Sequence, residues 1–77
     1  MVLAQALKKH FYKIIEMPHY PLFQAMGIRE GETVFIASRG LLNGPTIIRK
    51  NDRHYAIGKQ LAEKIVAFYE QQFNWVP

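Results

Sequence analysis

The alternation of apolar and polar side chains divides the chain into short segments, most of them with the period of a strand. Runs that are rich in β-branched and aromatic residues and interspersed with polar ones occupy residues 10–17, 32–38, 46–50 and 53–57. Such runs are typical of half-buried strands. Residues 2–7 are good helix formers and are long enough for one turn. The pattern therefore predicts at least four short strands and a helical turn at the beginning of the chain.

Two glycines four positions apart predict a corner between a short helix and the second strand. The Pro18-His19-Tyr20-Pro21 stretch breaks regular structure, and Pro21 suits the first position of a helix. Gly27 lies where a helix ends in a left-handed residue, and Gly31 suits a tight turn. We expect a helix of one or two turns that ends at Gly27 and a strand that starts just after Gly31.

The strands at 46–50 and 53–57 are separated by Asn51-Asp52, two residue types that tolerate positive φ in a hairpin turn. If these two residues form the loop, Ile48 faces Tyr55 across the ladder. The face that this register directs toward the core consists of Thr46, Ile48, Tyr55 and Ile57. We expect Arg49 and His54 on the opposite face, in solvent.

The last segment allows two interpretations. Residues 59–64 predict a helical turn with Leu61 facing inward, and Ile-Val-Ala-Phe-Tyr from Ile65 suits a strand. Five apolar residues also fall on one face of a continuous helix: Leu61, Ile65, Phe68, Tyr69 and Phe73. Local pattern does not distinguish a strand from a helix over residues 65–73.

Four or five short strands with one-turn helices predict a mainly β fold, a small and strongly bent antiparallel barrel. Bending the sheet onto itself covers edges that a 77-residue chain has little other means to cover. A two-layer α+β arrangement is the alternative. At this length we expect one domain over residues 1–77.

Composition restricts the class of protein and its compartment. There is no cysteine, hence no disulfide and no thiolate metal site. The sequence has neither a signal-peptide pattern nor an apolar run long enough for a membrane span. We expect a cytoplasmic protein. The net charge of +4 favours an anionic partner, but the lysines and arginines are scattered, so we expect a solvated surface rather than a nucleic-acid footprint.

Residues that carry catalytic or metal chemistry lack the necessary spacing. Ser38 is the only serine, without a His and carboxylate near it in the sequence. His10, His19 and His54 are not spaced as ligands of one metal. Glu30 and Glu32 flank a turn glycine, and we expect both to point into solvent. We therefore predict no enzyme, no metal site, no cofactor and no small-molecule substrate.

Ten aromatic residues allow either base stacking on a basic barrel or packing in a small core. Most lie within apolar runs, so we expect them in the core. Phe73 and Trp75 lie in a polar tail, and the sequence allows two interpretations: they contact a partner, or they form a lid over the barrel.

The chain has four segments, residues 26–34, 44–48, 55–57 and 61–65, whose order and spacing resemble those of the ferrous iron transport protein A (FeoA) family over about residues 22–66. Residues 26–34 resemble its methionine-glycine-leucine signature with the following glycine and valine, and residues 44–48 its entry into the third strand. Residues 55–57 and 61–65 are similar to its fourth strand and its closing segment. The chain departs from the family pattern at His10, Gly44 and Gly58.

This resemblance implies an SH3-like barrel that is a small, non-enzymatic, cytoplasmic accessory protein of ferrous iron uptake. It implies a partner, the membrane ferrous iron transporter, a GTPase-linked permease that is bound at its cytoplasmic part. For the contact we predict Arg39, Leu41 and Leu42, because apolar side chains on a glycine-rich loop often mark a binding surface. The alternatives are that this loop plugs the barrel end, that the basic barrel binds nucleic acid, or that the chain is a metal-responsive regulatory module. The oligomeric state is not predicted.

Overall fold

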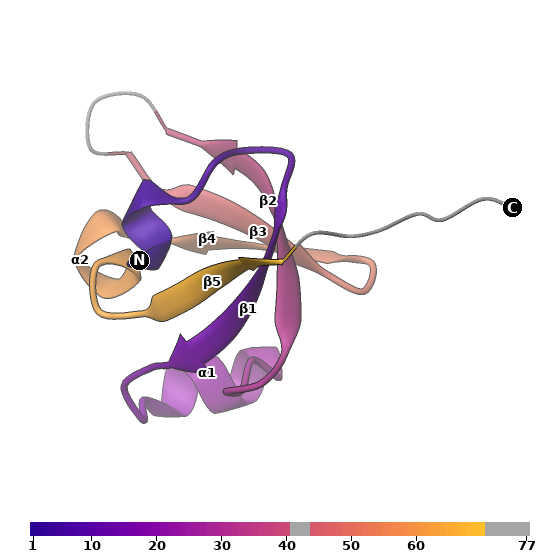
Figure 1. Cartoon of the computed structure of the whole chain (residues 1–77). Coiled ribbons are helices and arrows are strands. Elements are labelled where there is room, and N and C mark those ends of the chain that lie inside the picture. The colour runs from indigo at the N-terminus through magenta and orange to yellow at the C-terminus, as the bar shows by residue number, and fades with distance from the viewer. Residues whose placement is uncertain (41–43, 71–77) are drawn as a thin grey trace, which may run out of the picture.

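Short strands build the molecule, and helical turns connect them. The computed structural model describes residues 1–40 and 44–70 (Figure 1). The elements are the 3-10 helix η1 (Leu3–Gln5), β1 (Phe11–Glu16), α1 (Pro21–Met26), β2 (Thr33–Arg39), β3 (Thr46–Lys50), β4 (Arg53–Ile57), α2 (Lys59–Ala62) and β5 (Val66–Glu70). No helix in these two ranges is long and apolar enough to cross a membrane.

The strands form one antiparallel sheet in the order β4-β3-β2-β1-β5. Figure 1 shows the sheet bending so that β1 and β5 form one wall and β3 and β4 another. The register shifts between Ile36 and Ser38 in β2 and between Ile14 and Glu16 in β1. Such irregularities increase the local twist and help a short sheet to curl. The predicted mainly β, small-barrel class is confirmed, and the α+β alternative is not adopted.

One hydrophobic core fills the inside of the bent sheet. Its largest fully buried side chains are Tyr12, Leu3, Ile14, Ile36, Ile48, Ile57, Ile65 and Val34. Burying each aliphatic side chain contributes roughly 1.5–3 kcal/mol. The Tyr12 hydroxyl lies in this core and accepts a hydrogen bond of 2.9 Å from the backbone N–H of Leu7. This hydrogen bond therefore attaches the N-terminal segment to the core of the barrel.

The predicted β3–β4 hairpin is correct in its bounds and its register. Ile48 pairs with Tyr55 and Thr46 pairs with Ile57. Asn51 adopts φ 57°, the left-handed conformation that the two-residue turn needs. Arg49 and His54 are exposed, as expected.

The predicted corner is also confirmed. Pro21 begins α1, and Gly27 ends it with φ 74° while its N–H bonds back to the helix carbonyls. Gly31 has φ 91°, and its N–H donates to the Ile14 carbonyl at 2.7 Å. This bond attaches the corner to β1, so the glycines fix where β2 starts.

Pairing with another strand determines the structure of the last segment, which the sequence alone allows as a strand or a helix. Residues 66–70 are strand β5, because Tyr69 pairs with Tyr12 and Ala67 with Ile14 on β1. The helical interpretation is wrong for these residues, and Phe73 lies outside the described ranges. The N-terminus covers the other edge of β5, since the Ala67 N–H donates to the Met1 carbonyl at 2.8 Å.

Two expectations about side chains need correction. Five aromatic residues that were predicted in the core lie outside it. Phe68, Tyr69 and Tyr20 are 61%, 53% and 37% exposed, and Phe11 and Phe35 are half-buried on the outer face of the sheet. Glu30 and Glu32 were predicted to point into solvent. Glu30 is exposed, but its Oε2 accepts the Met17 N–H at 3.1 Å. Glu32 is only partly exposed and pairs with Lys50.

Candidate partner-binding surface

Arg39 is the one predicted contact residue that the structure describes; Leu41 and Leu42 lie outside the described residues. Arg39 is exposed at the end of β2, and its Nη2 donates to the Ala4 carbonyl at 2.6 Å. This bond joins the end of β2 to η1. The guanidinium thus lies beside η1 at the surface of the molecule.

The base of the loop that follows Arg39 is closed by the backbone. The Gly40 N–H donates to the Pro45 carbonyl at 2.7 Å, and Arg39 pairs with Thr46. A Cβ atom on Gly40 would lie 2.7 Å from the Gly44 Cα, a distance that side chains do not tolerate. Glycine at position 40 is therefore required for this close approach, which fixes where the loop leaves the barrel.

A small hollow of about 70 Å³ lies at this end of the barrel, lined by Ala4, Arg39, Gly40, Gly44, Thr46 and Lys59. Two of its six lining residues are cations, Arg39 and Lys59. Lys59 also pairs with Glu63, at 3.7 Å between exposed side chains, an interaction that solvent screens strongly. The hollow thus favours an anionic group, such as a partner's carboxylate.

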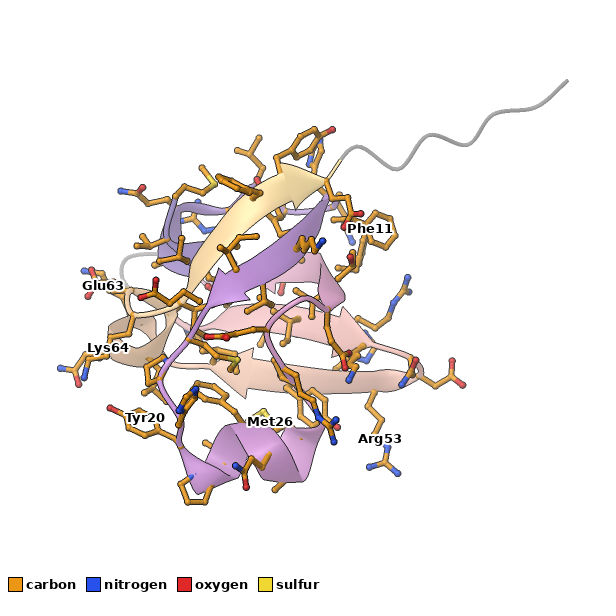
Figure 2. All side chains as sticks on the ribbon, turned by 60° about the horizontal axis from the view of Figure 1, so that its bottom comes forward. Phe11, Tyr20, Met26, Arg53, Glu63 and Lys64 are labelled. Atoms are coloured by element: carbon orange, nitrogen blue, oxygen red, sulfur yellow. The ribbon has the colours of Figure 1, made fainter. Side chains whose placement is uncertain are left out.

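A larger pocket, of about 360 Å³, lies between α1 and the turns on either side of it. Its apolar lining includes Met17, Phe23 and Ile28, and its polar lining includes Arg29 and Glu30. Tyr20 stacks on Phe23 with ring centroids 5.9 Å apart and planes at 15°. Figure 2 shows Tyr20 and Met26 at opposite ends of α1. An apolar pocket with polar groups at its rim suits an apolar anchor of a partner.

The sequence analysis missed this pocket. Its signal was the proline-flanked Pro18-His19-Tyr20-Pro21 stretch, in which a tyrosine outside any regular element precedes a short helix. The pocket itself depends on Ile28 and Glu30, which follow the helix and fold back toward it. The approach of Ile28 and Glu30 to the helix is a tertiary contact, which the periodicity of the local sequence does not indicate.

A third hollow, of about 330 Å³, lies where the β3–β4 turn meets the end of α1. Lys50 lines it and is largely buried, with Nζ 2.5 Å from Glu32 Oε2 and a hydrogen bond to the Gly27 carbonyl. Arg53 projects away from the sheet beside this turn (Figure 2). Because Lys50 already has two acceptors, its main effect is to clasp β3 to the corner.

The histidines are separated in the fold as they are in the sequence. His10 Nδ1 lies 2.8 Å from the Lys8 carbonyl, and its ring is 5.4 Å from that of Tyr69. His54 is on β4 and His19 precedes α1. Within residues 1–40 and 44–70, no three histidine or acidic side chains gather as a metal site.

Comparisons with known proteins extend the sequence resemblance over nearly the whole chain. The FeoA domain model matches residues 1–67. No curated protein matches the chain. Solved structures share the fold, among them the following two. One is a crystal structure described as an iron uptake regulatory protein (FeoA), with a TM-score of 0.74 and 21% identity, covering 87% of this chain and 93% of that one.

The other is the NMR structure of an FeoA-like protein from Clostridium acetobutylicum. It has a TM-score of 0.78 and 18% identity, and it covers 99% of this chain and 93% of that one. Both confirm the expected SH3-like fold. Because the family model covers residues 1–67 of 77, this chain belongs to the FeoA family.

Proposed function

We propose that this protein is a small accessory protein of ferrous iron uptake that binds and modulates the membrane ferrous iron transporter. The contact is with the cytoplasmic, GTPase-linked part of the transporter, and the protein acts without catalysing a reaction. The observation that carries this proposal is the FeoA domain match over residues 1–67. The similar crystal structure that is described as an iron uptake regulatory protein supports it.

The contact surface in this proposal is the end of the barrel between β2 and β3, with Arg39, Leu41 and Leu42. Two features of the described residues support it. A hydrogen bond between Gly40 and Pro45 closes the base of the loop, so the points where the chain leaves and rejoins the barrel are fixed. Arg39 and Lys59 supply positive charge beside that base. A preorganised surface loses less conformational entropy on binding.

Paired charge reversals test the location of this surface. Arg39→Glu removes the cation at the loop end, and Arg53→Glu makes the same charge change at the opposite end of the β3–β4 hairpin. Each variant is titrated calorimetrically with the soluble GTPase domain of the transporter from the same organism, and thermal melts verify that it folds. We expect Arg39→Glu to weaken binding at least tenfold and Arg53→Glu to leave it within twofold of the unmodified protein.

A second pair of variants tests the loop leucines. Leu41→Ser with Leu42→Ser should weaken binding to the GTPase domain and leave the melting temperature unchanged. A large loss of stability would show instead that the leucines plug the barrel end. Equal weakening by Arg39→Glu and Arg53→Glu would contradict the location of the surface, and no binding by the unmodified protein would contradict the proposed function.

A further inference from the structure

A row of side chains crosses the outer face of the sheet, on the side opposite the core. The pairings place Arg49 beside His54, Phe35 beside Arg49, Phe11 beside Phe35 and Glu70 beside Phe11. The row thus runs over all five strands. Figure 2 shows Phe11 on the outside of the sheet, near the start of β1. None of these residues belongs to the surface at Arg39.

Aromatic and cationic groups pack against each other within this row. The rings of Phe11 and Phe35 lie 4.9 Å apart with their planes at 57°. The Arg49 guanidinium carbon lies 4.7 Å from the centre of the Phe35 ring. Arg49 therefore covers one face of Phe35 while it remains exposed itself. Side chains held in this way present a fixed apolar and positive surface.

The neighbouring row extends the same surface. Lys13 is exposed and pairs with Phe68 on one side and Thr33 on the other. Phe68, at 61%, is the most exposed large apolar side chain in residues 1–40 and 44–70. The nearby Glu70 carboxylate accepts a hydrogen bond from the Thr33 hydroxyl. This hydrogen bond orients Glu70 toward Thr33 but leaves its charge in place, so the surface carries two cations, Lys13 and Arg49, and one acid.

We propose that this aromatic–cationic face, made of Phe11, Lys13, Phe35, Arg49 and Phe68, docks an acidic and apolar peptide segment of another protein. Carboxylates of the segment pair with Lys13 and Arg49, and its apolar side chains cover Phe68 and the half-buried edges of Phe11 and Phe35. Charge complementarity selects an acidic occupant. A second copy of a chain with a net charge of +4 is disfavoured by the same cations.

A peptide fits the geometry of the rings better than single-stranded nucleic acid does. Base stacking needs successive aromatic faces that are open to solvent. Here Arg49 covers Phe35, and Phe11 is tilted against Phe35 and half-buried. Only Phe68 offers an open ring within the row and its extension.

Selection from a random library of twelve-residue peptides on phage tests the proposal with no assumption about the transporter. Peptides are selected on the whole chain and then measured against two double variants. Phe68→Ser with Arg49→Glu alters the proposed face. Leu22→Ser with Arg53→Glu is the matched control, because it exchanges an exposed apolar side chain and an exposed cation for the same residues elsewhere. Thermal melts verify that both variants fold.

We expect the selected peptides to be enriched in Asp and Glu next to aromatic or aliphatic residues. The face variant should weaken their binding at least tenfold, and the control should leave it within twofold. The proposal is overturned by an absence of enrichment, or by peptides that bind both variants equally. The proposal is also overturned if oligo-dT of twenty nucleotides binds this face and the selected peptides do not, a result that would assign the face to nucleic acid.

Discussion

Replacing Lys50 with methionine tests whether the clasp between β3 and the α1–β2 corner stabilises the fold. The side chain of Lys50 is 17% exposed, and its Nζ contacts Glu32 Oε2 at 2.5 Å and the Gly27 carbonyl oxygen. Methionine keeps most of the aliphatic stem, so packing is nearly conserved. The ammonium group is lost, and both acceptors lose their partner.

The expected cost follows from the type and exposure of the two interactions. A hydrogen bond to a charged group contributes about 1.5–3 kcal/mol. The Glu32 side chain is 34% exposed, so water screens its pairing and partly replaces the lost partner. We therefore expect the free energy of unfolding to fall by about 2 kcal/mol. For a domain of this size, that lowers the melting temperature by roughly 8–16 °C.

Lys59→Met is the matched control for this experiment. Lys59 pairs with Glu63 at 3.7 Å, and the two side chains are 44% and 50% exposed. An exposed pair of this kind contributes about 0.5 kcal/mol or less. Urea unfolding followed by circular dichroism gives both free energies. Equal and small losses in the two variants would refute the claim that Lys50 clasps the corner.

Three further predictions concern stability and are measured by the same unfolding experiments. Gly40→Ala should destabilise by about 1–3 kcal/mol, because the new methyl group meets the backbone of Gly44 at 2.7 Å; an unchanged midpoint would show that the loop base relaxes freely. Tyr12→Phe should cost about 1 kcal/mol, since the Leu7 N–H loses its acceptor, and a neutral result would mean that water replaces it. Phe68→Ser should change the free energy of unfolding by less than about 0.5 kcal/mol, because the ring is mostly in solvent; a larger loss would show that this ring supports the fold.

The parts of the fold that the sequence predicted correctly depend on residues close together in the chain. The β3–β4 register follows from two turn residues, and the corner follows from Gly27 and Gly31, which both have positive φ. In each case the chemistry of one or two residues restricts the backbone directly. Tertiary context had little to add at these positions.

The parts that the sequence did not resolve depend on distant pairings. The apolar pattern of residues 66–70 is compatible with the period of a strand and with that of a helix. Only the pairing with β1 makes these residues a strand. That same ladder places Phe68 on the outer face, which an apolar run does not reveal. Arg39 was singled out from its loop, but its bond to Ala4 joins residues 35 positions apart. The pocket beside α1 likewise needs residues that come before and after the helix.

The most direct test of the proposed function is a titration of the isotope-labelled protein with the soluble GTPase domain of the ferrous iron transporter, followed by amide chemical shifts. We predict saturable shifts at Arg39, Gly40, Gly44 and Thr46, and none at the β3–β4 turn. Shifts absent at a domain concentration of several hundred micromolar would contradict the proposal that this protein binds the GTPase-linked part of the transporter.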